Sequence, residues 1–416
     1  MPVWRSCCRR GLPATIRFKV TTDVHARFGL ILCWFIGNEK CEKGDCPQLH
    51  VFCIFALMMG DSKNVKKGTV PNFTYPMVFE ANLHTVVWGG DRLCRWKGLP
   101  AQEHVGESWE VSAVESSPSV VANGPLKGKT LPEVVALAPR EILGETVARR
   151  NGGRMPLLVK FIDARNDLSI QVHPDDEMAQ REHGKLGKSE MWYVLDAEPG
   201  ACIYAGFKKK LQPDEYKKMV SDGTITDALA RHEAHAGDVF YIPAGRVHAI
   251  CSGILLAEIQ QSSDVTYRIF DYNRPGLDGK PRELHTALAA QALNYKVERK
   301  YRTDYAVRND RANLIMESKF FSARVTEIGR EFHRNLLKYD SFIITMCLKG
   351  DCVIKVRKTG DEVTLREGWS CMIPAAVADY DIRPVNGSCK VLDAFIDNQR
   401  GGLGNKIHRL FHKNKY

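Results

Sequence analysis

The chain has 416 residues and a mass of 46.8 kDa; 44% of its residues are hydrophobic and 26% are charged. This composition is typical of a folded, water-soluble protein of two or three domains, and it excludes a collagen-like, largely disordered or membrane-spanning chain. The net charge of +10 is modest and uneven, because residues 1–74 hold eleven Lys or Arg and five Asp or Glu. The rest of the chain has no basic stripe, so no nucleic acid partner is expected.

Residues 1–74 are predicted to form a poorly ordered extension outside the folded part of the protein. Their two apolar runs, 28–37 and 51–60, fall short of the roughly 18–20 residues that cross a bilayer, so no membrane partner is expected. A transit peptide stays open, because residues 1–22 contain several Arg and no acid. The thirteen cysteines are an odd and dispersed set, which favours reduced thiols in the cytoplasm.

From residue 79 onward the chain alternates short runs rich in Val, Ile, Phe and Tyr with Gly, Pro, Asn and Asp, a pattern typical of antiparallel β proteins. Strands are predicted at 157–163, 168–173, 191–195, 202–206, 238–242, 254–260 and 265–272. Helices are predicted as inserts at 131–137, 140–149, 213–220, 226–232 and 283–293. The even spacing of the strands indicates a mainly β fold, either a sandwich or a jelly roll.

A weak internal repeat indicates two copies of one β unit. The second copy lies 131 positions after the first. The aligned residues are Gly237 with Gly368, Pro243 with Pro374, Gly245 with Ala376, and His248 with Asp379. Gly and Pro shape the turns into and out of a strand, and the next strand then directs one side chain inward. The second copy therefore has a carboxylate where the first has an imidazole.

Four residues have side chains that suit a divalent metal: Gln171, His173, Glu190 and His248. Gln171 and His173 are two residues apart, so an extended strand places them on one face. Glu190 begins the next apolar run and His248 follows a Pro-x-Gly turn, so all four are expected to converge in one barrel. Two imidazoles, one carboxylate and one amide suit zinc, and also Fe(II), Mn or Co. One His alone in a strand is more often a buried core residue than a metal ligand. The combination of these four residues, however, favours a metal site.

Charged residues accompany these four. Lys188 lies two positions before Glu190 and faces the same interior, and Arg268 lies four positions after Asp264 on one strand face, with Glu258 nearby. A buried metal beside buried cations is costly to desolvate without an anion, and phosphate is the simplest one. The alternative is that Arg268 and Lys188 form surface ion pairs with Asp264 and Glu258. No phosphate-binding Walker loop, dinucleotide-binding Gly motif or Gly-x-Ser-x-Gly motif is present.

Taken in order, these motifs resemble the type I mannose-6-phosphate isomerases (phosphomannose isomerases) of the cupin superfamily, in their shorter bacterial form. The matching stretches are 88–91, 106–112, 123–125, 168–176, 188–193 and 243–249. The Gln-x-His-Pro element at Gln171 and the Lys-x-Glu element at Lys188 make the resemblance specific, and it extends from about Tyr75 to Asn398. Nothing in residues 1–74 or after Arg400 belongs to it.

The resemblance implies a metal-dependent aldose–ketose isomerase that interconverts mannose 6-phosphate and fructose 6-phosphate through an enediol. One Zn²⁺ per chain would be bound by Gln171, His173, Glu190 and His248. Arg268 would be catalytic, and Lys188, Glu258 and Asp264 would be its neighbours in the site, although the resemblance does not assign a separate role to each. Ser169 would lie beside the substrate phosphate. The alternatives are a cupin oxygenase, which the Gln ligand and buried cations disfavour, and a non-catalytic sugar-binding cupin.

The implied fold has two cupin jelly-roll barrels with helical inserts, the second barrel degenerate and without metal. The expected division is an extension at 1–74, a catalytic cupin domain at 75–282, a helical connection at 283–310, a second barrel at 311–398 and a basic tail at 399–416. The sequence leaves open whether the protein is a monomer or a homodimer.

Overall fold

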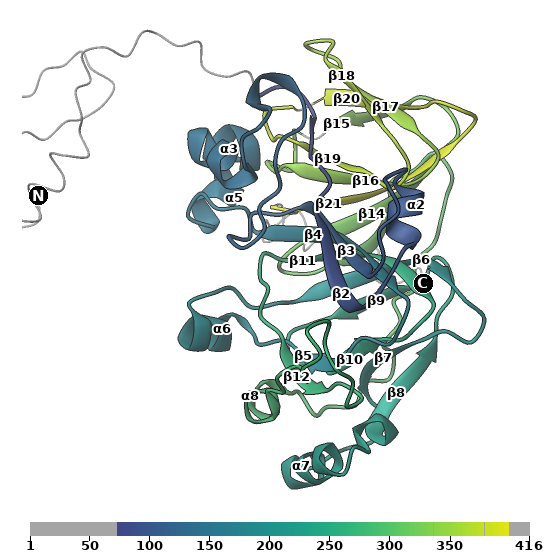
Figure 1. Cartoon of the computed structure of the whole chain (residues 1–416). Coiled ribbons are helices and arrows are strands. Elements are labelled where there is room, and N and C mark those ends of the chain that lie inside the picture. Colours follow the sequence, from purple (N-terminus) through teal and green to yellow (C-terminus); the bar gives the residue numbers. More distant parts are fainter. Residues whose placement is uncertain (1–72, 336, 378, 399–416) are drawn as a thin grey trace, which may run out of the picture. The chain divides into compact units, whose positions relative to one another are not determined.

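Four antiparallel sheets form the framework of the computed structural model, which describes residues 73–335, 337–377 and 379–398 (Figure 1). The prediction of a mainly β fold with a few helices is confirmed. Except for its last two residues, the predicted extension 1–74 lies outside the described residues, as does the predicted tail 399–416. One of those two, Phe73, is buried in the same core as the strands that follow.

The first half of the described chain forms a six-stranded and a five-stranded sheet. The six-stranded sheet has the order β2 (Leu83–Gly90), β3 (Val105–Val111), β4 (Leu157–Ala164), β11 (Ile254–Gln261), β6 (Glu190–Ala197) and β9 (Val239–Ile242). The five-stranded sheet has the order β12 (Tyr267–Phe270), β5 (Ile170–Val172), β10 (His248–Ile250), β7 (Cys202–Phe207) and β8 (Leu229–Glu233). All seven strands predicted from the sequence belong to these two sheets.

The second half repeats this strand order. Its larger sheet runs β1 (Met77–Val78), β19 (Ser370–Ile373), β16 (Ile343–Lys349), β21 (Cys389–Phe395), β14 (Ser322–Ile328) and β13 (Asn313–Glu317). Its smaller sheet runs β15 (Phe332–Asn335), β20 (Asp379–Pro384), β17 (Cys352–Val356) and β18 (Glu362–Leu365). Thus β9-β6-β11-β4 corresponds to β19-β16-β21-β14, and β5-β10-β7-β8 to β15-β20-β17-β18. The internal repeat predicted from two turns is confirmed at the level of topology.

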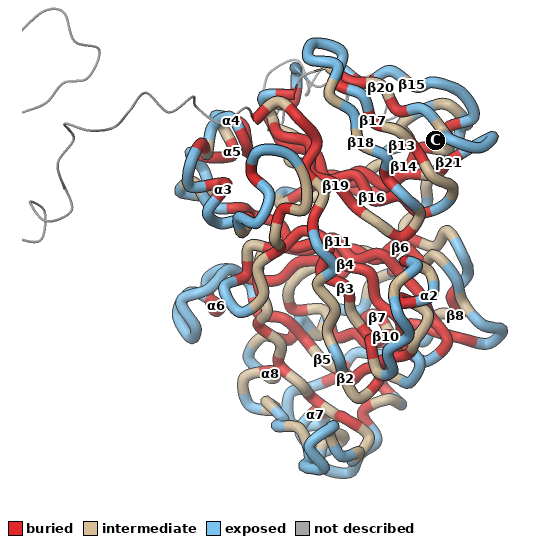
Figure 2. Tube along the Cα trace, turned by 45° about the horizontal axis from the view of Figure 1, so that its top comes forward, coloured by how far each residue is buried: buried red, intermediate tan, exposed pale blue. Residues whose placement is uncertain are grey.

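The two halves share one hydrophobic core. All eight residues of both β4 and β11 are buried, because each strand is covered on both faces. Leu157, Val159 and Phe161 of β4 pack into a cluster that also contains residues of β16 and β21. Alternation then directs Leu158, Lys160 and Ile162 to the opposite face. Figure 2 shows this buried zone as the red tube through β4, β11, β16 and β19. One face of β4 therefore supports the fold and the other is available for a site.

The helices agree with the sequence in part. α3 (Leu131–Leu137), α7 (Pro213–Ser221) and α8 (Thr286–Ala292) occur where helices are predicted. The single helix predicted at 140–149 is divided into two helices, α4 (Pro139–Leu143) and α5 (Glu145–Arg150). The helix predicted at 226–232 is wrong, because a 3-10 turn (Ile225–Ala228) leads into β8 there. The sequence missed α2 (Arg92–Trp96), α6 (Asp176–His183) and the 3-10 turn Gly124–Leu126.

Gly144 separates α4 from α5 because it has a φ of +93°, which residues with a Cβ rarely adopt. A Cβ there would lie 2.3 Å from the carbonyl oxygen of Asp340. The Asp340 carboxylate also accepts hydrogen bonds from the backbone N–H groups of Glu145 and Thr146, at 2.9 and 2.8 Å. This contact joins the helices of the first half to the second half.

Gly144→Ala is accordingly expected to lower the free energy of unfolding by about 3 kcal/mol, from backbone strain and loss of the Asp340 contacts. Gly152→Ala is the matched control: its φ is also positive, at +58°, but nothing lies within 4 Å of the added Cβ. We expect it to cost about 1 kcal/mol. Urea denaturation of both variants measures this difference, and equal losses would contradict the role given to Asp340.

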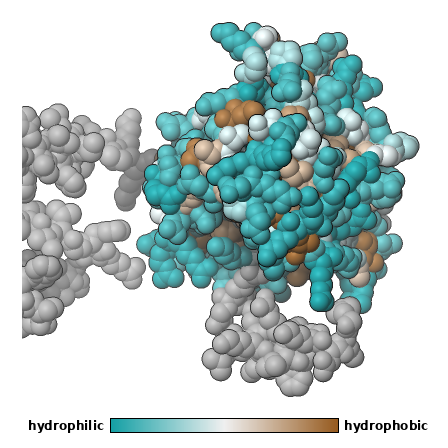
Figure 3. All heavy atoms as spheres, turned by 90° about the horizontal axis from the view of Figure 1, so that it is seen from below, coloured by the Kyte–Doolittle hydropathy of each residue, from teal (hydrophilic) through white to brown (hydrophobic). Residues whose placement is uncertain are grey.

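Among the described residues, no helix combines the length and the apolar character that crossing a membrane requires. The face of the molecule in Figure 3 is mainly hydrophilic, with small and scattered hydrophobic areas.

Candidate functional site

The two sheets of the first half bring three predicted metal ligands together. Glu190 is the first residue of β6, His248 is the first residue of β10, and His173 directly follows β5. Their ligand atoms all lie within 4.8 Å of one another, and all three side chains are buried. Gln171 is paired with His248 on the neighbouring strand, which places the two side chains on one face of the sheet. The expected convergence of His173, Glu190 and His248 is therefore found in the structure.

Hydrogen bonds orient both imidazoles toward Glu190. The Nδ1 atoms of His173 and His248 lie 3.0 and 2.8 Å from the carbonyl oxygens of Val265 and Arg246, so each Nδ1–H donates to a carbonyl. Each Nε2 then presents a lone pair 3.3 Å from a carboxylate oxygen of Glu190. The Nε2 atom of His248 and Oε1 of Glu190 are buried and have no hydrogen-bond partner. Two facing acceptors of this kind suit a divalent cation.

The protonation states also favour metal binding. Burial lowers the pKa of His173 to about 3, an effect that the Lys188 ammonium strengthens. Burial likewise lowers the pKa of His248, so both imidazoles are neutral near pH 7. Burial alone would raise the pKa of Glu190, but the nearby Lys188 ammonium and His173 outweigh it and hold that pKa well below its usual value. The donor set, two neutral imidazoles and a carboxylate, fits zinc and related ions.

The other predicted site residues line one cavity of about 360 Å³ next to this cluster. They are Ser169, Gln171, Lys188, Glu258, Asp264 and Arg268. Lys188 Nζ lies 2.5 Å from Glu190 Oε2 and 2.9 Å from His173 Nε2, so it joins the cavity to the candidate metal centre. The structure thus assembles all nine predicted residues in one place.

The alternative of surface ion pairs is wrong. Lys188 and Glu258 are only 5% and 3% exposed, and Lys188 is paired with Glu190 instead. Asp264 pairs with Lys185, with Nζ 2.5 Å from Oδ1. Arg268 donates from Nη1 to the carbonyl oxygen of Glu283 at 2.8 Å, while its buried Nε has no hydrogen-bond partner. A buried guanidinium N–H without a partner is what a site for an anionic or hydroxylated ligand needs.

Sequence reasoning missed a second charged cluster in the same cavity. Lys160 Nζ lies 3.1 Å from Glu107 Oε2 and 3.6 Å from Glu258 Oε2, above the Trp109 ring. Trp192 Nε1 donates to Glu258 Oε1 at 2.9 Å. Burial raises the pKa of Glu258, with Glu190 adding to the effect and the two lysines opposing it. One feature of the sequence could have revealed this cluster: Lys160 is a single cation inside the otherwise apolar run Leu157–Ile162, so a buried charge was to be expected there.

The described residues of the second half contain no matching cluster, and strand pairing shows why. In the first half, Glu190 lies between Ile242 and Gln260 on neighbouring strands. At the same register of the second half, Ile343 lies between Ile373 and Phe395. The site of the first carboxylate is therefore occupied by an apolar side chain. In the part of the chain that the structure describes, His173, Glu190 and His248 form the one group of three or more such ligands.

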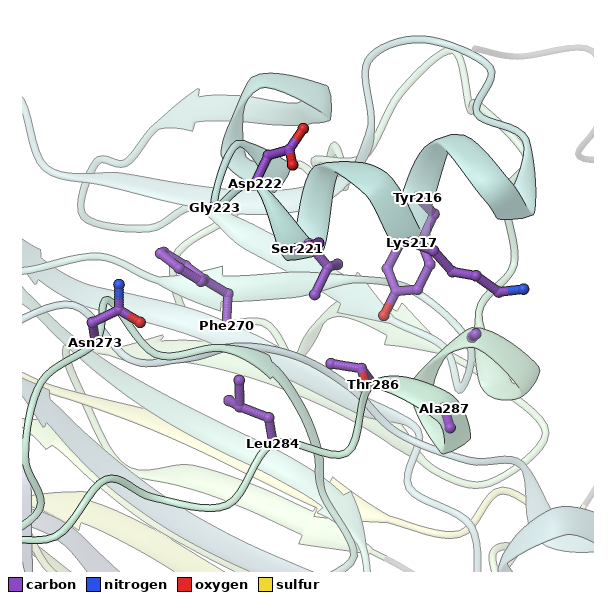
Figure 4. Close-up of a pocket in the computed structure, with 12 residues that line it drawn as sticks. Tyr216, Lys217, Ser221, Asp222, Gly223, Phe270, Asn273, Leu284, Thr286 and Ala287 are labelled. Carbon is purple, nitrogen blue, oxygen red and sulfur yellow. The ribbon is translucent and has the colours of Figure 1, made fainter.

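A larger cavity, of about 590 Å³, lies between α7 and α8 (Figure 4). Its walls include Tyr216 and Lys217 from α7, Phe270 from β12, and Leu284 and Thr286 near the start of α8. None of the predicted site residues lines it, and it contains neither a buried imidazole nor a buried carboxylate. The smaller cavity beside the candidate metal ligands is therefore the candidate active site.

Comparisons with known proteins point to one family. A model of the catalytic domain of type I phosphomannose isomerase matches residues 78–228. The mannose-6-phosphate isomerase ManA of Bacillus subtilis is 41% identical over 221 residues, which cover 53% of this chain and 68% of that protein. The Streptococcus mutans mannose-6-phosphate isomerase is 40% identical over 220 residues, 52% of this chain and 67% of that one.

One solved structure is similar to this chain over nearly its whole length. The crystal structure of mannose 6-phosphate isomerase from Bacillus subtilis aligns with a TM-score of 0.69 and 33% identity. The alignment covers 77% of this chain and 99% of that chain. The chain therefore belongs to the type I phosphomannose isomerase family.

Proposed function

We propose that this protein is a mannose-6-phosphate isomerase, which interconverts mannose 6-phosphate and fructose 6-phosphate. The observation that carries the proposal is the buried cluster of His173, Glu190 and His248, which lies next to a cavity lined by Lys188 and Arg268. The reaction moves a proton between C1 and C2 of an open-chain sugar, so it needs a base, an acid and positive charge near O1 and O2. We propose that Glu258, Lys188 and Arg268, which all line the cavity, supply them.

The metal is proposed to be one Zn²⁺ held by Gln171, His173, Glu190 and His248. When bound there, it would supply a Lewis acid that polarises the sugar oxygens. The amide oxygen of Gln171 would complete the set, because it faces the same side of the sheet as His248. The chain's own residues account for the remaining tasks.

Glu258 is the residue that we propose to move the proton between C1 and C2. The Trp192 indole fixes its Oε1, and its raised pKa brings the carboxyl group closer to the operating pH, where proton transfer in both directions is efficient. Lys188 is the second candidate for this task. Arg268 would balance the negative charge that develops on the sugar oxygens, and Ser169, with Asp264 nearby, would contact the substrate at the cavity wall.

The direct test is a coupled assay of fructose 6-phosphate formation from mannose 6-phosphate, with the metal content of the protein measured on the same sample. Turnover that is lost with a chelator and restored by zinc supports the proposal. Oxygen consumption without isomerisation would instead support an iron-dependent oxygenase. Sugar phosphate binding without turnover would indicate a non-catalytic cupin.

Lys160→Met is expected to shift the pH dependence of the reaction. Lys160 lowers the pKa of Glu258, so its removal raises that pKa further. The ionised base is then formed only at higher pH, and the acidic limb of kcat/KM moves upward. Lys160→Arg retains the charge and should keep the profile near its original position. Profiles of kcat/KM against pH for the three proteins measure this, and an unmoved limb in Lys160→Met would contradict the role given to Glu258.

We also propose that residues 75–282 carry the whole site and that residues 311–398 act as a metal-free support, with 283–310 as the connection. All nine proposed site residues fall in the first range. The protein is proposed to act in the cytoplasm as a monomer or homodimer. Light scattering combined with chromatography would determine its mass in solution.

A further inference from the structure

Two cysteines that play no part in the proposed chemistry lie side by side at the end of the five-stranded sheet. Cys202 begins β7 and Cys251 directly follows β10, and their sulfur atoms are 3.1 Å apart. The pairing of Ile203 with Ile250 puts the two cysteines opposite each other, and the Cys251 N–H donates to the Cys202 carbonyl oxygen at 3.0 Å. Neighbouring strands therefore hold both backbones at a separation that a disulfide spans.

The surroundings favour a reactive thiol at Cys202. Both cysteines are 6% exposed, but Gly200 and Ser252 beside them are exposed, so a small oxidant can approach. Arg231 lies next to the pair, with its Nη2 donating to the Gly200 carbonyl oxygen at 2.9 Å. The hydrogen-bonded thiol of Cys251 and, to a lesser extent, the Arg231 guanidinium lower the pKa of Cys202 to about 7, against the effect of burial. A thiolate beside a cation is the form that oxidants attack.

We propose that Cys202 and Cys251 form a reversible intramolecular disulfide when the protein meets a peroxide. The Cys202 thiolate attacks one peroxide oxygen, the O–O bond breaks, and a sulfenic acid and one water form. The Cys251 sulfur then attacks the sulfenic sulfur, the S–O bond breaks, and a second water leaves. Two thiols are oxidised to one disulfide and one peroxide is reduced to two waters.

This modification is positioned to affect the candidate metal centre. Closing the sulfur–sulfur gap of 3.1 Å to a bond of about 2.05 Å brings the two sulfur atoms closer by roughly 1 Å and ties Cys251 to β7. β10 contains only His248, Ala249 and Ile250, so Cys251 is three residues from His248. A displacement at Cys251 is therefore transmitted to His248 along one short strand. This second part of the inference rests on the proposed function, whereas the disulfide itself does not.

The experiment treats the reduced full-length protein with hydrogen peroxide and maps its cysteines by mass spectrometry. We expect a peptide pair that joins Cys202 to Cys251, 2 Da lighter than the reduced pair and released by dithiothreitol. Cys251→Ala should retain isomerase activity and give no such pair, while Cys94→Ala, which changes a buried cysteine of α2, should behave like the original protein. Absence of the joined peptides, or separate over-oxidation of the two thiols, would overturn the proposal.

The effect on His248 has its own readout. In the oxidised protein, kcat/KM is expected to fall by about 10-fold or more, since displacements near 1 Å at a site have large effects on rate. Dithiothreitol should restore it, and Cys251→Ala should resist the peroxide. A disulfide that forms without any change in kcat/KM would refute the coupling. Because mapping needs no turnover, a failure of the proposed isomerase function would be seen separately.

Discussion

Glu190→Gln is expected to remove the bound metal and to lower kcat/KM by about 10²–10³-fold or more. Gln has the shape of Glu without its charge, and Glu190 is the one carboxylate in the cluster with His173 and His248. The exchange also leaves the buried Lys188 ammonium without the carboxylate that lies 2.5 Å from it. Metal content, kcat/KM and a urea unfolding curve on the same preparation separate loss of metal from loss of fold.

The matched control is Glu182→Gln, which neutralises a carboxylate on α6 that pairs with the exposed Arg181. We expect that variant to keep both metal and activity, because ion pairs on the surface contribute little. A folded Glu190→Gln protein with its full metal content and unchanged kcat/KM would show that the cluster is not the metal centre. Loss of metal with activity intact would show that the metal is not needed for the reaction.

Arg268→Lys is expected to leave the metal in place and to lower kcat by about 10²-fold or more. Arg268 is paired with Gln171 across neighbouring strands, so it faces the cavity beside the metal ligands. Lysine keeps the positive charge but loses the planar set of N–H donors, including the Nε–H that is buried and unpartnered. The variant therefore tests the geometry of the guanidinium rather than its charge.

Arg181→Lys is the control, since its side chain is 55% exposed on α6 and lies outside the cavity. Steady-state kinetics and metal analysis of both variants provide the measurement. An Arg268→Lys protein with normal kcat would remove Arg268 from the reaction. An equal loss of metal and activity would mean that Arg268 supports the metal centre instead of the substrate.

Strand phase explains why much of the site was predictable. In an extended strand the side chains alternate, so the two-residue spacing of Gln171 and His173, or of Lys188 and Glu190, fixes a shared face from local sequence alone. The Gly-x-x-x-x-x-Pro-x-Gly pattern before His248 likewise specifies a turn, and its weak copy around Pro374 revealed the repeat. The candidate metal ligands and the mainly β class follow from these local features.

Errors in the helices have a physical cause too. The apolar spacing at 226–232 is compatible with a helix, but the segment from Leu229 onward pairs with β7 as β8. In a segment this short, hydrogen bonds to a neighbouring strand outweigh intrinsic helix preference. The short helices α2 and α6 carry too few turns for a clear period.

What the sequence determined by itself is the set of residues that share a face of each strand, and with it the candidate ligands, the repeat and the fold class. The tertiary structure alone decided which strands become neighbours. That choice placed Lys160 between Glu107 and Glu258, put Ile343 at the position of Glu190, and brought Cys202 against Cys251 across 49 residues of chain. Alternation along a strand is a local property of the backbone, whereas strand neighbours depend on the packing of the whole core.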